Sequence, residues 1–533
     1  MSKAASTRIT PGLADRSNPP QDPVTYPAQD GRPERGVPRL RSPLPAAEPA
    51  DAAHRLVGAL APLLHEWLPR QRWFAGKGRP VTGFAPVAVT ELVTEGPGRP
   101  GLLHLLIRVD QHGRAGQRSA PAPAPGRDRY QDCYQLLLGV RHTLPASLAG
   151  AALGRVEQGP LAGRTVYEGL HDPYIADVLL ERLRTPGTPG PLRFCRAAPV
   201  PAGLTGRLLD AEQSNSSLVY GTSGAGYGAD APGGPGSGGY ILKILRRVFP
   251  GPHPDLELPL ALAAEGCERV PAPAGWIEAA DPTAGARTGA GETLTLGVLQ
   301  PYLRDSRDGW CLALGALTGD REFTEEARAL GRATAEVHLA LAAALPTVTL
   351  GRRQTALLAE SMTERLEAAA RAVPALLPYV PGLRTVFDAL AALGSTGGGR
   401  TAQRVHGDLH LGQALRTPDG RWSVIDFEGE PARPLAERRR PQLPVRDVAG
   451  MLRSFDYAAR SHEPWRPEWA ARCRAAFCEG YAAGSGSDPR AEPEVLRAYE
   501  TDKAVYEVLY EARHRPAWLP VPMAAIRRLA EGA

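Results

Sequence analysis

Residues 405–413 read VHGDLHLGQ, and ten residues further on residues 423–431 read SVIDFEGEP. The first stretch places Asp408 between two histidines, and the second is a short apolar run that ends at Asp426. Transfer of a phosphoryl group needs a carboxylate that accepts the proton of the attacking hydroxyl, and oxygen ligands that hold Mg²⁺. Asp408 suits the first role, and Gln413 with Asp426 suits the second. The two stretches together predict a magnesium-dependent phosphotransfer site.

The same chemistry needs groups upstream that hold the phosphates of ATP. The segment EQSNSSLVYG (212–221) places small polar residues between two strand-like runs, and its candidates are Ser214, Asn215, Ser216 and Ser217. Lys243 follows in YILKILRR (240–247), which has the composition of a strand. An acid on the next helix could fix the direction of this lysine. The sequence favours Glu257 for that role and leaves Asp255 possible.

A third feature lies between the two groups of motifs. The run GVLQPYL (297–303) resembles a hinge between two lobes, where the backbone near Gln300 and Tyr302 could hydrogen-bond an adenine.

From about residue 52 to 300 the chain is dominated by short apolar runs with turn residues between them, and from about 322 onward by helical periodicity. Strands followed by helices predict an α+β fold with segregated layers.

The order of these parts is that of the kinase-like fold shared by protein kinases and aminoglycoside phosphotransferases. More specific motifs resemble bacterial maltokinases, and they are WLPRQRWFAGKGR (67–79), EQSNSSLV, ILKILRRVFPGPHPDLE (241–257), HGDLHLGQ, IDFEGEP and RDVAGMLRSFDYAA (446–459). The resemblance spans residues 52 to 523. It implies ATP-dependent formation of maltose 1-phosphate, which feeds α-glucan synthesis.

The resemblance also implies roles for individual residues. Asp408 would be the catalytic base, Gln413 and Asp426 would hold Mg²⁺, and Lys243 would bind ATP phosphates and pair with Glu257. The bilobal fold expected from it has a tail without structure (1–48), a cap packed on the small lobe (49–150), the remaining nucleotide-binding strands (151–303) and a helical lobe (304–533).

The acceptor is expected on the helical lobe. In KAVYEVLYEARHRPAWLPVP (503–522), one helical face carries Lys503, Tyr506, Glu507 and Tyr510 at spacings of three and four residues. Aromatic rings beside charged hydrogen-bonding groups suit a disaccharide, so we expect these four residues to bind maltose. Trp73 and Phe74 are expected to pack the cap onto its neighbour.

Several other interpretations stay open from the sequence. His406 and His410 could suggest zinc, but a zinc site needs further ligands at suitable spacing; His406 is expected instead to brace its loop. Asp447 is most simply a helix N-cap, and His338 a hydrogen-bonded packing residue. Glu428 and Glu430 could face the metal or lie on a solvated hairpin.

Alternative functions also stay open. One is a kinase for another acceptor, such as an aminosugar or an aminoglycoside. Another is a non-catalytic ATP-binding partner of a trehalose-isomerising enzyme, since the family is sometimes fused to one. A functional association with a trehalose synthase also stays open.

Composition limits the remaining possibilities. The net charge is only +5 in 533 residues, and no segment interleaves dense basic residues with aromatics, so nucleic acid is not an expected partner. Six scattered cysteines and the lack of an apolar N-terminal segment favour the cytoplasm. No uninterrupted apolar run approaches the ~20 residues of a membrane helix. A monomeric cytoplasmic enzyme is expected, with segments 1–48, 113–127 and 221–239 too polar or too rich in Gly and Pro to fold.

Overall fold

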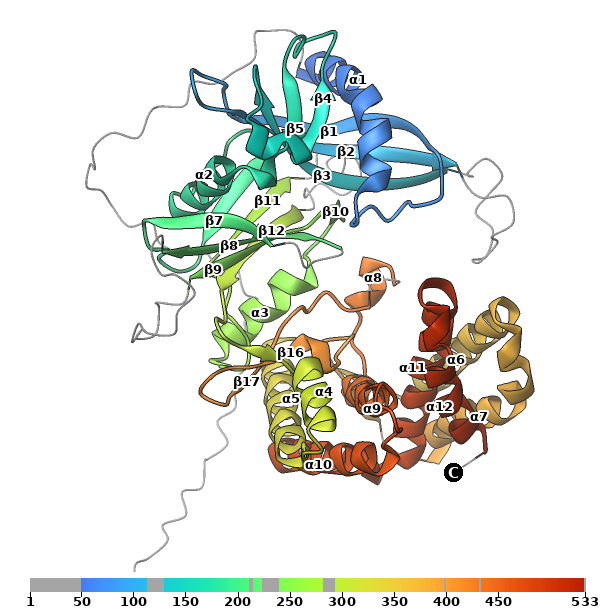
Figure 1. Ribbon diagram of the computed structural model, residues 1–533. Helices are drawn as coiled ribbons and strands as arrows, with labels where there is room; N and C mark the ends of the chain where they lie inside the picture. The colour runs from blue at the N-terminus through green and yellow to red at the C-terminus, as the bar shows by residue number, and fades with distance from the viewer. Residues whose placement is uncertain are drawn as a thin grey trace, which may run out of the picture. The chain divides into compact units, whose positions relative to one another are not determined.

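The computed structural model describes residues 49–112, 129–209, 214–222, 239–280, 293–396, 399–430 and 433–531. The predicted disordered tail (1–48), the insertion 113–127 and all but the ends of the insertion 221–239 lie outside the described residues. Most strands precede residue 301 and most helices follow it (Figure 1). The predicted α+β fold with segregated strands and helices is therefore confirmed.

The first antiparallel sheet packs against the N-terminal helix α1 (Pro49–Trp67) (Figure 1). Its strands are β1 (Val81–Val93), β2 (Gly101–His112), β3 (Arg129–Arg141), β4 (Ala152–Arg155) and β5 (Thr165–Glu168), in the order β1-β2-β3-β5-β4, and β10 (Arg247–Val248) pairs with β3. Strand β2 is apolar on both faces. Leu103, Leu105 and Ile107 lie in one core with α1, whereas Leu102 and Leu106 lie in a second core. Because side chains alternate along a strand, this sheet lies between two buried layers.

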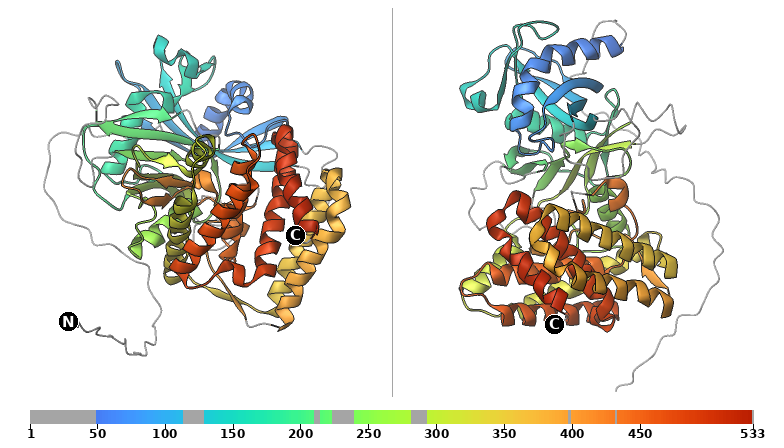
Figure 2. Two further views of the ribbon diagram at one scale, coloured as in Figure 1. Left: turned by 60° about the horizontal axis from the view of Figure 1, so that its bottom comes forward. Right: turned by 90° about the vertical axis from the view of Figure 1, so that its right-hand side faces the viewer.

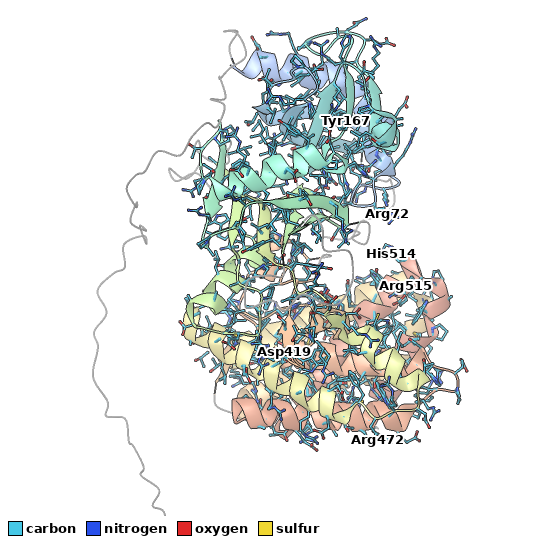
Figure 3. The ribbon with its side chains drawn as sticks, turned by 60° about the vertical axis from the view of Figure 1, so that its left-hand side comes forward. Arg72, Tyr167, Asp419, Arg472, His514 and Arg515 are labelled. Atoms are coloured by element: carbon cyan, nitrogen blue, oxygen red, sulfur yellow. The ribbon has the colours of Figure 1, made fainter. Side chains whose placement is uncertain are left out.

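The second sheet shares the second core with the first. Its strands are β6 (Leu192–Arg196), β7 (Leu204–Leu209), β8 (Ser216–Thr222), β9 (Tyr240–Ile244), β11 (Gly275–Ala280) and β12 (Thr293–Pro301), in the order β6-β11-β12-β9-β8-β7. Helix α2 (Pro173–Arg184) precedes this sheet, and α3 (Pro254–Ala264) follows β10. Tyr167 of β5, labelled in Figure 3, donates to Asp172, the N-cap of α2, at 2.7 Å. This buried hydrogen bond links the first sheet to α2.

The helical region surrounds one large apolar core. Its helices are α4 (Gly309–Thr318), α5 (Thr324–Ala344), α6 (Arg352–Ala372), α7 (Val380–Thr396), α8 (Leu435–Arg438), α9 (Val445–Arg460), α10 (Pro467–Ser485), α11 (Pro493–His514) and α12 (Pro520–Glu531). Two small sheets join it, one of β13 (Arg307–Asp308), β16 (Ala414–Arg416) and β17 (Trp422–Val424), the other of β14 (Val348–Leu350) and β15 (Arg400–Ala402). Figure 2 shows α6 and α7 side by side, next to α11 and α12.

One described stretch, Pro374–Leu393, is long and apolar enough to cross a membrane by length and composition. The sequence expectation required an uninterrupted apolar run, and this stretch contains Arg384 and Asp388. Its side chains Leu383 and Phe387 are buried in the core of the helical region. The stretch therefore packs one face against this core, and 28% of it is buried.

Candidate active site

A β-hairpin brings together the two predicted metal ligands. Ala414 of β16 pairs with Val424 of β17, so Gln413 and Asp426 lie at the open end of the hairpin. The N–H of Ile425 donates to the Gln413 carbonyl at 3.0 Å, and Gln413 Nε2 donates to Asp426 Oδ2 at 2.8 Å. Asp426 has a φ of 66°, a left-handed conformation that is uncommon for residues other than glycine. The hairpin thus fixes both side chains at one edge.

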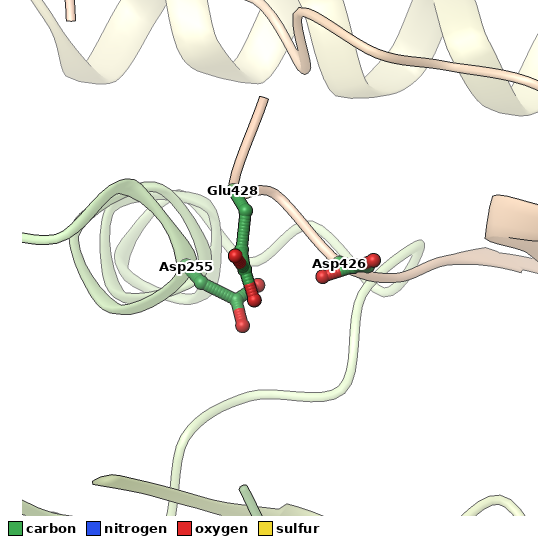
Figure 4. A group of neighbouring side chains, drawn as sticks. All are labelled: Asp255, Asp426 and Glu428. Atoms are coloured by element: carbon green, nitrogen blue, oxygen red, sulfur yellow. The ribbon is translucent and has the colours of Figure 1, made fainter. Parts of the chain in front are cut away.

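Three carboxylates surround the ammonium group of Lys243. Its Nζ lies 2.9 Å from Asp255 Oδ2 and 2.5 Å from Asp426 Oδ1. The third contact, to Glu428 Oε1, is also 2.5 Å. Figure 4 shows the three acids converging from α3 and from the segment after β17. One ammonium facing three carboxylates leaves an excess of negative charge, which favours a divalent cation at this place.

The pKa values of these acids reflect the crowding. Burial raises the pKa of Glu428 to about 7; Lys243 opposes this rise, and the negative charges of Asp426 and Asp255 add to it. Burial also disfavours the ionised form of Asp426, but the Lys243 ammonium outweighs it and holds the pKa of Asp426 below its usual range. The group therefore shares more negative charge than its single lysine neutralises.

The sequence favoured Glu257 as the partner of Lys243, and that pairing is wrong. Asp255 accepts from Lys243 Nζ through Oδ2 and from the Phe427 N–H at 2.7 Å through Oδ1. Glu257 lies two residues along α3 and instead has its Oε2 2.8 Å from Arg404 Nη1. Two residues span about 200° around a helix, so only one of the two acids can face β9.

Hard oxygen ligands of this kind fit Mg²⁺. The carboxylate oxygens of Asp255, Asp426 and Glu428 lie within 4.8 Å of one another. Gln413 donates its amide nitrogen to Asp426 here, so its oxygen would face a cation only after the carboxamide turned over. Of the ligands predicted from the sequence, Asp426 lies within this acidic group, and Gln413 lies beside it. Glu428, which the sequence left open, belongs to it.

The loop that carries Asp408 is held by a buried carboxylate. Asp447 accepts from the N–H groups of His406 and Gly407, both at 2.8 Å. Asp447 lies in the first turn of α9, whose N-cap is Pro444. The prediction that Asp447 is a helix N-cap is therefore wrong. Its carboxylate oxygens accept hydrogen bonds from the N–H groups of the loop and do not cap the N–H groups of its own helix. Gly407 has a φ of +84°, so the loop turns where a glycine is needed.

Two histidines brace the same region, as expected. His406 Nε2 lies 2.9 Å from the Ile425 carbonyl, which links the loop to the end of the hairpin. His338 on α5 lies with Nδ1 2.9 Å from the Tyr481 hydroxyl and Nε2 3.0 Å from Asp447 Oδ2. Both ring nitrogens of His338 are hydrogen-bonded, so the prediction of a partnered packing histidine is confirmed.

Asp408 is in contact with the expected acceptor helix. Lys503 Nζ on α11 lies 2.8 Å from Asp408 Oδ1 and 4.9 Å from the centre of the Tyr506 ring. Burial lowers the pKa of Lys503, but the carboxylates of Asp408 and Glu430 outweigh that effect and raise it above its usual range. The lysine is therefore charged and directs the carboxylate of Asp408 through one oxygen.

A small cavity of about 20 Å³, room for about one water molecule, lies beside this pair. Its lining combines acidic, basic and aromatic groups: Gly407, Asp408, Leu409, Glu430, Arg433, Arg446, Asp447, Gly450, Tyr499, Asp502, Lys503 and Tyr506. Burial disfavours the charge of Glu430, but Lys503, Arg446 and Arg433 outweigh it and lower its pKa to about 2. The cavity is a charged site built from α9, α11 and the two motif segments.

The other two predicted acceptor residues lie differently. Glu507 is buried, and its Oε2 accepts from Arg453 Nε at 3.0 Å and from Nη2 at 2.7 Å. Burial raises the pKa of Glu507, against the opposing charge of Arg453. Tyr510 is 39% exposed, with its ring 6.2 Å from that of Tyr506. The structure brings Lys503 and Tyr506 to Asp408, and it places Glu507 against α9.

The predicted phosphate-binding residues lie at the start of β8. Ser214 is exposed, whereas Asn215, Ser216 and Ser217 are buried. Asn215 Nδ2 donates to Glu428 Oε1 at 2.6 Å, so this segment touches the acidic group. The hydroxyl of Ser216 already accepts from an arginine inside the protein. A role of all four in holding phosphates stays a prediction.

The predicted hinge residues lie at the end of β12. Gln300 Nε2 donates to the Pro271 carbonyl at 3.2 Å. The N–H of Tyr302 donates to the Gly239 carbonyl at 3.1 Å, and its carbonyl accepts from the Arg304 N–H at 2.9 Å. Because the Tyr302 amide is already engaged, an adenine contact through it would require a rearrangement, and the adenine role stays a prediction.

Sequence reasoning missed Arg433, Arg446 and Asp502 of the cavity, and it left Glu430 open between the metal region and a solvated hairpin. Glu430, Arg446 and Arg433 form a buried ion-pair group in which Arg446 also donates to the Gly407 carbonyl at 3.2 Å. Asp502 pairs with Arg365 at 2.8 Å. The signal was present, since each of these cavity residues lies within a quoted motif or at most two residues from one. The sequence did not show that these side chains point into the cavity, because charged residues beside motifs are usually solvated.

Comparisons with known proteins place the chain in a family. Residues 67–172 match the model of the maltokinase N-terminal cap domain, and residues 237–499 match that of the phosphotransferase enzyme family. A glucosamine kinase from Streptacidiphilus jiangxiensis is 30% identical over 440 residues, covering 76% of this chain and 92% of that protein. A glucosamine kinase from Mycolicibacterium smegmatis is 29% identical over 380 residues, covering 67% and 88%.

The fold has solved counterparts. A structure of glucosamine kinase in complex with glucosamine, ADP and inorganic phosphate superposes with a TM-score of 0.58 at 22% identity, covering 88% of this chain and 98% of that chain. At this identity the superposition shows the bilobal kinase-like fold alone. Together with the identity over most of a curated relative, these matches show that the chain belongs to the phosphotransferase enzyme family and carries a maltokinase-type N-terminal cap domain.

Proposed function

We propose that the protein transfers the γ-phosphoryl group of ATP to a hydroxyl of an amino sugar, with glucosamine as the acceptor. The observation that carries this choice is the identity of 30% along 440 residues with a glucosamine kinase. The sequence alone favoured maltose, and named an aminosugar as the alternative. The relatives support the alternative better than the main expectation.

The cavity beside Asp408 is the expected acceptor position, and with a volume of about 20 Å³ it admits a sugar only if its lining side chains move apart. Its lining includes four carboxylates, Asp408, Glu430, Asp447 and Asp502, against three cations, Arg433, Arg446 and Lys503. Asp502 is also paired with Arg365, which lies outside the lining, so these charges are balanced and do not by themselves choose between an amino sugar and a neutral sugar. The Lys503–Asp408 pair, and the pairs of Arg433 and Arg446 with Glu430, would hydrogen-bond sugar hydroxyls.

The reaction follows from the position of Asp408. The hydroxyl oxygen of the acceptor attacks the γ-phosphorus, the bond from that phosphorus to the bridging β–γ oxygen breaks, and ADP leaves with the electron pair. Lys503 contacts Oδ1 of Asp408, so Oδ2 is the atom that accepts the hydroxyl proton. The backbone bonds from His406 and Gly407 to Asp447 hold the loop during this transfer.

Asp426 and Glu428, with Asp255 and a turned Gln413 as further candidates, would hold Mg²⁺. The ion would neutralise charge on the β- and γ-phosphates when bound. Lys243 lies in the same group of acids and would contact the phosphates directly.

A coupled ADP-release assay tests the acceptor. Glucosamine, N-acetylglucosamine, glucose and maltose are compared at matched concentrations with ATP and Mg²⁺. Glucosamine is expected to give the highest kcat/KM, and N-acetylglucosamine, which lacks the ammonium charge, is expected to lose at least about tenfold, the cost of about 1.4 kcal/mol. Equal rates with both sugars would contradict the role of the amine.

Maltose is the second candidate, and the match of residues 67–172 to the maltokinase cap domain favours it. Maltose would be phosphorylated at its anomeric hydroxyl. In the same assay, maltose-dependent ADP release that exceeds the rate with glucosamine would replace the amino-sugar proposal, and phosphorus NMR of the product would locate the new phosphate ester.

A further inference from the structure

We propose that Arg246 is a positioning residue through which the first sheet, the cap, holds the phosphate segment in its working position. The phosphate segment is defined here as Ser214–Ser217. The proposal rests on the proposed function in one respect, that this segment binds the nucleotide. It assigns the cap a part in nucleotide binding, although no cap residue lies among the predicted ligands.

Arg246 contacts the phosphate segment through both its side chain and its main chain. Arg246 is 1% exposed, and its Nε donates to Ser216 Oγ at 2.8 Å. Its backbone N–H donates to Asn215 Oδ1 at 3.3 Å. One residue therefore holds two neighbouring side chains of the segment, one by the guanidinium and the other by the main chain.

The phosphate segment in turn contacts the acidic group around Lys243. The Asn215 side chain that accepts from Arg246 also donates through Nδ2 to Glu428 at 2.6 Å. Glu428 in turn contacts Lys243 Nζ. An amide held at its oxygen cannot rotate without losing the bond at its nitrogen. The position of Asn215 and the orientation of Glu428 are thus set together.

Three residues of the cap domain (67–172) contact Arg246, which itself lies outside that domain. Its Nη2 donates to Glu168 Oε1 on β5 at 3.1 Å, and its guanidinium carbon lies 4.8 Å from the centre of the Trp73 ring. The N–H of Gln135 on β3 donates to the Arg246 carbonyl at 2.8 Å. Three separate parts of the cap therefore hold this one residue, which in sequence follows the strand of Lys243.

The buried ion pair between Arg246 and Glu168 is incompletely hydrogen-bonded. Among the described residues, Arg246 Nη1 and Glu168 Oε2 are buried without a hydrogen-bond partner. An apolar pair of the same volume would pack this position at equal or lower cost. A guanidinium alone offers directed donors in one plane that reach Glu168 and Ser216 together. The incomplete ion pair is explained if its purpose is to aim the phosphate segment.

The test compares two adjacent arginines. Arg246→Met removes the link, whereas Arg247→Met removes a half-exposed ion pair with Asp132 on β3 and leaves the phosphate segment untouched. We expect Arg246→Met to raise the KM for ATP and the Kd for ADP with Mg²⁺ by about tenfold or more, the loss of one or two charge-assisted hydrogen bonds. The KM for the acceptor should change less than about twofold in both variants.

Arg246→Lys should recover part of the ATP affinity, because an ammonium reaches one partner but cannot serve both. Arg246→Met also leaves Glu168 buried without its cation, so the variant could fail to fold. The double variant Glu168→Gln with Arg246→Met removes that isolated charge and is measured in the same way. Melting curves establish that each variant is folded.

An ADP affinity of the folded double variant equal to that of the unaltered protein would overturn the proposal. So would equal losses in the Arg246→Met and Arg247→Met variants. Failure of the proposed function has a different signature, which is an unaltered protein that binds ADP but phosphorylates no sugar. In that case the effect of Arg246 on ADP binding is still measured directly and decides the inference by itself.

Discussion

At the scale of single residues, the carboxylate of Asp408 is the group with the largest expected effect on turnover. Asp408→Asn keeps the shape and the hydrogen bond to Lys503 Nζ but cannot accept a proton. We expect kcat to fall by about 10²–10⁴-fold while ADP binding is retained. Steady-state ADP release and calorimetry measure the two quantities. Asp419→Asn, in the exposed turn of the β16–β17 hairpin, is the control.

Near-normal turnover in Asp408→Asn, with Asp419→Asn also unaffected, would remove Asp408 from the mechanism. Loss of ADP binding in Asp408→Asn would instead point to a structural effect, since the loop backbone is held by Asp447 and not by Asp408.

The ion pair of Lys503 has a predictable dependence on pH. The pKa of Lys503 is raised above its ordinary value of 10.5, so the stabilisation it supplies is complete below that pH and is lost as pH rises through the folded-state pKa. Lys503→Met should lower stability by about 2 kcal/mol. The Tm difference from the unaltered protein should be constant between pH 7 and 9. A difference that disappears within that range would show that the lysine is not paired as described.

Residues of the site differ in how far a sequence can place them. Helical spacing predicts that Lys503 and Tyr506 share a face, and both lie next to Asp408. The same spacing includes Glu507, but that residue turns toward α9 and binds Arg453. The direction of a residue at the edge of a helical face depends on which helix packs beside it. For Glu507 that helix is α9, which lies about fifty residues away in the chain. Local periodicity carries no information about it.

At the scale of elements, helix α3 decides how the strand lysine is held. Asp255→Asn removes one of the three carboxylate charges around Lys243 and weakens the acceptor of the Phe427 N–H, whereas Glu257→Gln weakens a contact with Arg404. We expect the KM for ATP to rise more in Asp255→Asn than in Glu257→Gln, by about tenfold. Initial rates at varied ATP measure this. The reverse order would restore Glu257 as the partner of Lys243.

Elements with a continuous pattern were predictable and their ends were not. The run of β2 and the periodic helices after residue 322 follow from side-chain alternation and helical repeat. The choice between Asp255 and Glu257 depends on where α3 begins, after His253 as N-cap. A shift of two residues exchanges the two acids, and sequence patterns do not fix helix starts to that accuracy.

At the scale of the whole molecule, nucleotide contacts should join elements from the second sheet and the helical region. ADP with Mg²⁺ at 100 times its Kd should stabilise the folded state by about 2.7 kcal/mol. Melting curves with and without nucleotide measure the shift. Removal of Mg²⁺ with EDTA should abolish most of it, because the acids around Lys243 then repel the phosphates. An EDTA-resistant shift would argue against the acidic group as the metal site.

The left-handed backbone of Asp426 has a consequence for how such an enzyme can lose its catalytic activity. Glycine or asparagine would suit a φ of 66° at least as well as aspartate. Either replacement would relieve repulsion among the neighbouring acids and remove a candidate metal ligand. A single codon change at this position would then yield a well-folded pseudokinase, so the fold by itself offers no protection against silent loss of catalysis.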